Sequence, residues 1–132
     1  MVPQGPKKPD AVRVVLVDDQ EEVRTVIRRF MERDGRFDIV GEGENGQEGI
    51  DLVRTHRPDV VLMDLAMPGV NGMEAIRTIS AGSPDTKIVV LSSMVPFGDT
   101  KDGAEEWGAH AAFDKYTPPK KLIKALITLL GR

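Results

Sequence analysis

The sequence predicts an α/β fold, a doubly wound open sheet of five parallel strands with helices on both faces. Short apolar runs rich in β-branched residues alternate with segments of helical periodicity, which is the pattern of parallel strands buried on both sides. Each strand-plus-helix unit takes about 25 residues. Five such units use nearly all of the 132 residues. A closed barrel would need about 250 residues, so the open sheet is favoured.

Three strands are predicted from nearly continuous apolar runs, each followed by polar residues. These runs are Val12–Val17 before Asp18 and Asp19, Val60–Met63 before Asp64, and Ile88–Leu91 before Ser92. Two further strands are weaker: Phe37–Gly41, expected at an edge of the sheet, and the short run His110–Phe113.

Helical spacing of apolar residues follows every predicted strand. The helices are expected to begin near Val23, Asn45, Gly72, Asp99 and Thr117. In the first helix the expected buried face is formed by Val23, Val26, Ile27 and Phe30, with the arginines on the opposite face. The fourth helix, around 99–107, is rich in glycine and is expected to be short or mobile.

The last helix has the strongest pattern. Thr117 is expected to cap it and Pro118 to occupy its first position. Its apolar residues, Leu122 to Leu130, cover more than the stripe that one sheet face needs. Two interpretations stay open: a wide core face with a frayed end, or contact of Leu129 or Leu130 with a second protomer or an output domain.

Composition excludes several classes of function. Without cysteine the chain has no disulfide framework, thiolate metal site or cysteine nucleophile. The net charge of −3 argues against a basic nucleic-acid surface. No apolar run approaches the roughly 18 residues of a membrane span. Residues 1–10, with three prolines, are expected to be a disordered lead-in to one domain over 11–132 of a soluble, cytoplasmic protein.

The polar residues at the strand ends predict the functional site. Right-handed crossovers bring the carboxyl ends of parallel strands to one edge of the sheet. There the sequence has the carboxylates Asp18, Asp19 and Asp64, the Ser92 hydroxyl and the Lys115 ammonium. Crowded carboxylates repel one another, and a hard divalent ion such as Mg²⁺ relieves the repulsion. A carboxylate can also attack a phosphoryl group whose oxygens are neutralised by Mg²⁺, the lysine and the hydroxyl.

The motifs that carry these residues resemble the receiver domain of two-component response regulators. They are Val14–Asp19, Pro58–Leu65, Met67–Gly72, Val90–Ser93 and Lys115. The similarity covers 12–130, and Thr117-Pro118-Pro119 resembles receivers that precede a helix-turn-helix output domain. The resemblance implies a flavodoxin-like, three-layer fold with strand order 2-1-3-4-5.

By position, the resemblance also implies a role for each site residue. Asp64 would be the phosphoacceptor and a Mg²⁺ ligand. Asp19 would bind Mg²⁺ directly and Asp18 through water, with the backbone carbonyl of Ala66 completing the protein ligands. Ser92 would be the switch hydroxyl, and Lys115 would pair with the phosphoryl group.

The resemblance implies partners rather than external substrates. The phosphoryl donor would be a histidine kinase, a phosphotransfer protein or a small acyl phosphate. The domain would switch conformation to control an output domain or form a homodimer through its fourth and fifth helices. It would bind neither nucleic acid nor membrane directly, and it would not be an enzyme with external turnover.

The sequence departs from the family pattern at two positions near the lysine. Ala112 stands where the family has an aromatic switch residue, and neighbouring Phe113 faces the opposite side of the strand. Tyr116 stands where a proline usually follows the lysine.

Two alternatives remain, and a third motif is set aside. A Mg²⁺-dependent phosphatase with an aspartate nucleophile would need a second aspartate where Ala66 stands. A receiver-like scaffold that no longer signals would fit the missing aromatic. The G-x-G-x-x-G pattern of Gly41–Gly46 is interpreted as a flexible turn, because it follows an edge strand and contains Glu42 and Glu44, which would repel a pyrophosphate.

Overall fold

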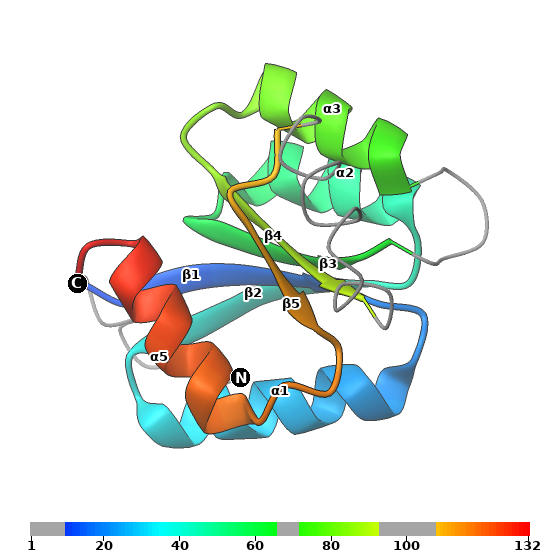
Figure 1. Cartoon of the computed structure of the whole chain (residues 1–132). Coiled ribbons are helices and arrows are strands. Elements are labelled where there is room, and N and C mark those ends of the chain that lie inside the picture. The colour runs from blue at the N-terminus through cyan, green and yellow to red at the C-terminus, as the bar shows by residue number, and fades with distance from the viewer. Residues whose placement is uncertain (1–9, 66–71, 93–107) are drawn as a thin grey trace, which may run out of the picture.

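The structure is a computed structural model that describes residues 10–65, 72–92 and 108–132, arranged as a three-layer sandwich (Figure 1). In chain order the elements are β1 (Val12–Val17), α1 (Glu21–Asp34), β2 (Phe37–Gly43), α2 (Gly46–His56), β3 (Val60–Asp64), α3 (Gly72–Gly82), β4 (Lys87–Ser92), β5 (Ala111–Asp114) and α5 (Pro119–Leu129). Residues 1–9 of the expected lead-in over 1–10, residues 66–71 and the predicted fourth helix lie outside the described residues. None of the helices in the described ranges is long and apolar enough to cross a membrane.

The sheet has the predicted topology. All strand pairs are parallel, and the order is β2-β1-β3-β4-β5. Helices α1 and α5 cover one face, and α2 and α3 cover the other (Figure 1). The chain reverses its direction of travel across the sheet between β1 and β3, which is where open α/β sheets bind ligands at the carboxyl ends of their strands.

The central strands are buried on both faces, as their continuous apolar runs predict. Val14 and Val15 are both fully buried, yet Val14 packs in the cluster under α1 and α5 and Val15 in the cluster under α2 and α3. On β3, Leu62 and Met63 alternate in the same way. Alternation of side chains on a strand therefore supplies two separate cores from one sheet.

Strand β2 extends to Gly43, two residues beyond its predicted end. The pairing of β1 with β2 shifts register, from Val14 opposite Ile39 to Val15 opposite Gly41, and the irregularity lets β2 continue alongside β1. A Cβ atom at Gly41 would lie 2.8 Å from Leu52 Cδ2 of α2. Within the G-x-G-x-x-G pattern, this glycine therefore serves close packing of α2 on an edge strand.

Helix α2 begins where the sequence predicts. The Asn45 side chain accepts a hydrogen bond from the backbone N–H of Glu48 at 2.9 Å, and Glu48 Oε1 accepts one from the N–H of Glu44 at 2.8 Å. The first bond satisfies one of the N–H donors that the first turn of a helix leaves free, and the second ties the residue before the N-cap to the helix.

The predicted buried face of α1 is wrong. The helix is rotated about its axis, so that a different set of side chains faces the sheet. Its buried residues are Arg24, Ile27 and Met31, while Val26 is 47% exposed. Val23 and Phe30 are only partly buried against the core. An arginine that was expected on the outer face therefore points inward.

The predicted start of α5 is also wrong by one residue. Pro118 is the N-cap and Pro119 begins the helix. The Thr117 hydroxyl donates to the Asp114 carbonyl at 2.7 Å instead of capping the helix, because the turn after β5 uses it. Leu122, Ile123 and Leu126 are buried. Leu129 and Leu130 pack, partly buried, against the same cluster, which agrees with the wide core face.

Candidate functional site

The aspartates at the ends of β1 and β3 meet at the carboxyl edge of the sheet. Val17 of β1 lies opposite Met63 of β3, so Asp18 and Asp64, which follow them, are neighbours. Carboxylate oxygens of Asp18, Asp19 and Asp64 all lie within 4.8 Å of one another. Asp64 is 2% exposed and Asp18 5%, whereas Asp19 is exposed. The structure thus brings together the three predicted carboxylates.

Lys115 reaches the same cluster from the end of β5. Its Nζ donates to Asp64 Oδ2 at 2.9 Å and lies 3.2 Å from Asp18 Oδ2. Burial by itself would lower the pKa of Lys115, but the hydrogen bond that it donates to Asp64 and the charges of both aspartates outweigh burial and raise it. The ammonium therefore keeps its charge and faces the carboxylates.

Asp18 is only partly satisfied. Its Oδ1 accepts a hydrogen bond from the N–H of Gln20 at 2.8 Å. Its Oδ2 is buried, and among the described residues it has no hydrogen-bond donor in good geometry; Lys115 Nζ is its ion-pair partner at 3.2 Å. Burial, with the charge of Asp64, raises the pKa of Asp18 against the opposing effects of the Gln20 N–H and Lys115.

The donor set fits Mg²⁺. Three carboxylates offer hard oxygen ligands. Among the described residues, Lys115 is the cation that pairs with them, so the described part of the cluster carries an excess of negative charge. The oxygen of Asp18 that accepts no hydrogen bond is the kind of atom that a cation or its bound water satisfies. Such a cation would favour the ionised carboxylates.

Two predicted site residues are less fully described. Strand β4 ends at Ser92, whose neighbour Leu91 pairs with Asp64, so the Ser92 backbone lies at the same edge. The Ser92 side chain lies outside the described part of the chain, and so does Ala66. Their expected roles as switch hydroxyl and carbonyl ligand stay predictions.

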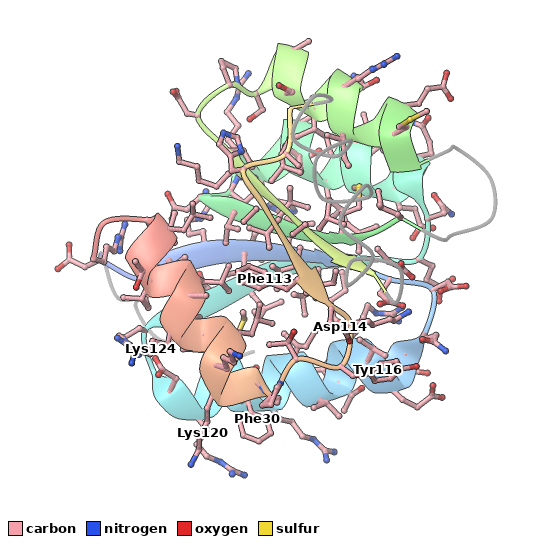
Figure 2. The ribbon with its side chains drawn as sticks, viewed as in Figure 1. Phe30, Phe113, Asp114, Tyr116, Lys120 and Lys124 are labelled. Atoms are coloured by element: carbon pink, nitrogen blue, oxygen red, sulfur yellow. The ribbon has the colours of Figure 1, made fainter. Side chains whose placement is uncertain are left out.

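The turn after β5, in which Figure 2 labels Asp114 and Tyr116, is held by hydrogen bonds to Asp114. Asp114 Oδ1 accepts from the N–H of Tyr116 at 2.7 Å, and its carbonyl accepts from the N–H of Thr117 at 3.0 Å. The 115–116 peptide bond is trans, since the described residues contain no cis peptide bond. Tyr116 is 75% exposed and, with Val26, lines an apolar cleft beside Lys115. The aspartate before the lysine is thus a structural residue of the site that sequence reasoning did not single out.

The residues next to the lysine face opposite sides of β5, as predicted. Ala112 is buried in the cluster with α2 and α3, and Phe113 packs on the side of α1 and α5. Phe113 therefore lies away from the position at which the family pattern has an aromatic.

Arg24 is a further residue at the site that sequence reasoning missed. Its guanidinium donates to the backbone carbonyl of Asp18. The available signal was its spacing: Arg24, Ile27 and Met31 share one face of a helix.

Comparisons with known proteins agree with this geometry. The family model for the response regulator receiver domain matches residues 14–127. Response regulator UvrY of Escherichia coli (strain K12) is 44% identical over 115 residues, which are 87% of this chain and 52% of that protein. The chain thus spans about half the length of this curated relative, and less of others.

Solved structures give the same result. The signal receiver domain of NarL from Mycobacterium tuberculosis is similar with a TM-score of 0.87 and 27% identity, covering 93% of this chain and 98% of that one. The isolated REC domain of RcsB from Salmonella enterica serovar Typhimurium, solved in the presence of the phosphomimetic BeF₃⁻, is similar with a TM-score of 0.81 and 27% identity, covering 92% and 89%. From sequence, fold and site together, the chain belongs to the response regulator receiver domain family of two-component signalling.

Proposed function

We propose that this chain is a phosphorylation-controlled switch in which Asp64 accepts a phosphoryl group in a Mg²⁺-dependent reaction. One observation carries the proposal: Lys115 Nζ lies 2.9 Å from a buried oxygen of Asp64 inside a cluster of three carboxylates. A structural ion pair would need one carboxylate. Three carboxylates against one ammonium make a site for a divalent cation and an incoming anion.

In the proposed reaction an Asp64 carboxylate oxygen forms a bond to phosphorus while the bond from phosphorus to the donor breaks. For a phosphoramidate or phosphohistidine donor, the electron pair leaves with nitrogen, which takes up a proton from water. Lys115, released from the free carboxylate, then holds one phosphoryl oxygen. Bound Mg²⁺ supplies neutralisation of the remaining negative charge.

The protein ligands proposed for Mg²⁺ are Asp19 directly, Asp18 through water, Asp64 and the Ala66 carbonyl. Exposure of Asp19 supports its direct role, because an ion can reach this carboxylate from solvent. Ser92 is proposed to bond the phosphoryl oxygens in only one of two conformations, which makes phosphorylation shift the equilibrium between them.

The donor is proposed to be a histidine kinase or phosphotransfer protein, and the output a partner or a further domain. The relatives include two transcriptional regulatory proteins that match over only 34% and 40% of their length, which supports control of transcription through a separate domain.

Phosphoramidate and Mg²⁺ test the proposal without a cognate kinase. The wild type is expected to gain one phosphoryl group by intact mass, and the Asp64→Asn variant none. Asp51→Asn, on the exposed surface of α2, is the matched control and is expected to behave like the wild type. Equal labelling of wild type and Asp64→Asn would contradict the proposal.

Two further outcomes identify the alternatives. Multiple turnovers on a phosphomonoester would favour the phosphatase. Absence of any chemical-shift change with beryllofluoride and Mg²⁺ would favour a scaffold that no longer signals.

A further inference from the structure

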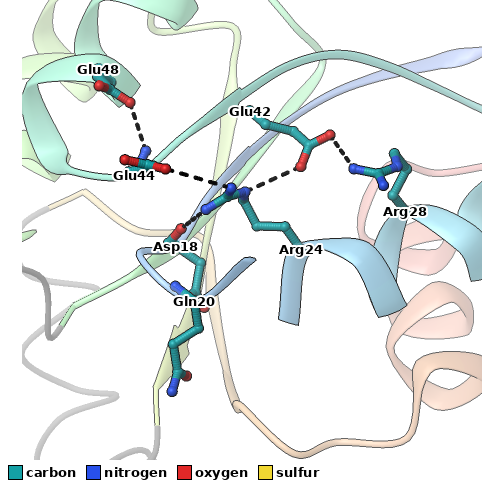
Figure 3. A network of polar contacts seen from close by, with 7 residues as sticks. All are labelled: Asp18, Gln20, Arg24, Arg28, Glu42, Glu44 and Glu48. Atoms are coloured by element: carbon teal, nitrogen blue, oxygen red, sulfur yellow. Dashed lines mark hydrogen bonds and ion pairs between the residues drawn. The ribbon is translucent and has the colours of Figure 1, made fainter. Parts of the chain in front are cut away.

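A buried arginine contacts the backbone of the acidic cluster. Arg24, in the first turns of α1, is 8% exposed, and its Nη1 donates to the backbone carbonyl of Asp18 (Figure 3). The contact joins α1 to the turn that carries two of the three clustered aspartates. Because the acceptor is a backbone carbonyl, the bond restrains the chain and leaves the Asp18 carboxylate available.

The charge of Arg24 is compensated away from the cluster. Its Nε donates to Glu42 Oε1 at 3.2 Å, and its Nη2 lies 3.9 Å from Glu44 Oε1. Arg28 Nη1 donates to the other oxygen of Glu42 at 2.6 Å (Figure 3). Two guanidinium groups thus face two carboxylates, so the network is close to neutral and does not oppose a cation bound nearby.

The restrained peptide is the one that leads into Asp19. The N–H of Asp18 donates to the Gly43 carbonyl of β2 at 3.0 Å, and its C=O accepts from Arg24. That C=O belongs to the peptide unit between Asp18 and Asp19, which is planar. Arg24 therefore fixes the plane from which the exposed Asp19 side chain projects toward the other carboxylates.

We infer that Arg24 is a positioning residue for the divalent-cation site. It holds the Asp18–Asp19 peptide in the orientation that brings the three carboxylates together, with Glu42 of β2 as its anchor. The inference rests on the proposed function, since it concerns the cation that the phosphoacceptor site would use.

The network contains its own matched control. Arg24→Met and Arg28→Met each remove one of the two cations on Glu42 and leave the other in place. Both change the net charge by the same amount, but only Arg24 contacts Asp18. Loss of a nearby positive charge by itself would strengthen Mg²⁺ binding. Weaker binding in Arg24→Met would therefore run against the charge effect and report positioning.

The experiment is a calorimetric Mg²⁺ titration of the full chain. Arg24→Met is expected to weaken the affinity about tenfold or more, as loss of an outer-shell partner of a metal site does. Arg28→Met is expected to stay within about twofold of the wild type, because its ion pair is partly exposed. An Arg24→Met affinity equal to that of Arg28→Met, or tighter, would overturn the inference.

A second measurement separates positioning from loss of stability. Without Mg²⁺, the amide resonances of Asp18 and Asp19 are expected to shift in Arg24→Met and to stay in place in Arg28→Met. Unchanged resonances in both variants would overturn the inference. If Arg24→Met does not fold, Arg24→Lys and Arg28→Lys take the same roles, since lysine keeps the charge but not the planar fork.

Mg²⁺ binding by the wild type distinguishes failure of the proposed function from failure of the inference about Arg24. If it binds no Mg²⁺, the proposed function fails and the inference with it. If it binds Mg²⁺ and the Arg24 variants bind equally well, only the inference fails.

Discussion

The two edges of the sheet carry polar groups of opposite kinds. At the amino edge, where the strands begin, the buried polar side chains are those of Ser83 and Thr86, which are neutral and hydrogen bonded. At the carboxyl edge they are charged, and one of their oxygens accepts no well-formed hydrogen bond from the residues that the structure describes. The buried polar groups at one edge of the sheet therefore stabilise the fold, whereas a carboxylate oxygen at the other edge is available to bind a cation.

The amino edge is closed by hydrogen bonds between segments distant in sequence. Thr86 Oγ1 donates to the Pro58 carbonyl at 2.8 Å and lies 2.7 Å from Ser83 Oγ. Asp59 Oδ2 accepts from the N–H of Arg13 at 2.8 Å. These contacts join the starts of β1, β3 and β4. Each group has a partner within the protein, so none of them invites a ligand.

At the carboxyl edge, by contrast, the described residues do not fill the hydrogen-bonding capacity of every buried polar group. Within the described ranges Asp18 Oδ2 has an ion-pair partner but no well-formed hydrogen bond, and burial raises the pKa of Asp18. Keeping such a carboxylate buried costs folding stability, which proteins commonly tolerate at functional sites. The comparison predicts that substitutions at the amino edge change stability alone, while changes at the carboxyl edge act on cation binding.

The largest effect is expected from Thr86→Val at the amino edge. The substitution leaves the Pro58 carbonyl and the Ser83 hydroxyl without this partner in a buried place, so the free energy of unfolding should fall by about 2 kcal/mol. Urea denaturation measures the loss. Thr78→Val, at an exposed position on α3, is the control and should change stability little. An altered Mg²⁺ affinity in Thr86→Val would contradict the prediction that substitutions at the amino edge change stability alone.

The next effect is stabilisation by Mg²⁺ at the carboxyl edge. At ten times its Kd, Mg²⁺ should raise the free energy of unfolding by about 1.4 kcal/mol. In Asp64→Asn, with one carboxylate lost, a tenfold weaker Kd would reduce the gain to about 0.4 kcal/mol. Asp59→Asn, at the other end of the same strand, should keep the full gain. Equal gains in both variants would show that the cation binds elsewhere.

The smallest effect is a pH dependence at the amino edge. His110 Nδ1 accepts from the N–H of Ile88 at 3.0 Å, so that nitrogen is unprotonated in the folded state. Partial desolvation of the ring and then the charge of Lys87 lower the pKa of His110 from its ordinary value of 6.5. The folded state thus binds this proton less readily than the unfolded state. The stabilisation is present above pH 6.5 and is lost as the pH falls through the lowered pKa.

Urea denaturation of the wild type and of His110→Asn between pH 7.5 and 5.5, without Mg²⁺, measures this dependence. The difference between the two proteins should be less than about 1 kcal/mol, the net worth of one hydrogen bond. The same comparison with His56→Asn, at the only other histidine, serves as control. A wild type whose stability relative to His110→Asn rises on acidification would contradict the sign.

Most of the fold could be predicted because its signals are local. A continuous run such as Val60–Met63 is apolar on both faces of a strand, which only a sheet covered on both sides can bury. The ends of such runs also located Asp18, Asp64 and Lys115, since parallel strands align their carboxyl ends. The end of β2 was missed because a register shift against β1 depends on the pairing of strands.

The orientation of α1 could not be predicted from its spacing. Val23, Val26, Ile27 and Phe30 fit a helical stripe, and so do Arg24, Ile27 and Met31. Hydrophobicity favours the first set. The second set is the one that is buried, because Glu42 and the Asp18 carbonyl bind the guanidinium of Arg24. These acceptors come together only after β2 has paired with β1.

By itself, then, the sequence determined the order of strands and helices, the sheet edge that carries the chemistry, and the residue types that meet there. Tertiary structure alone decided how that chemistry is held: which oxygen of Asp18 accepts no hydrogen bond, which aspartate binds Lys115, and which arginine fixes the turn. The physical reason is the separation along the chain of the residues that interact. Periodicity and strand ends are written in neighbouring residues, whereas burial of a charge is tolerated only where distant segments supply its partners.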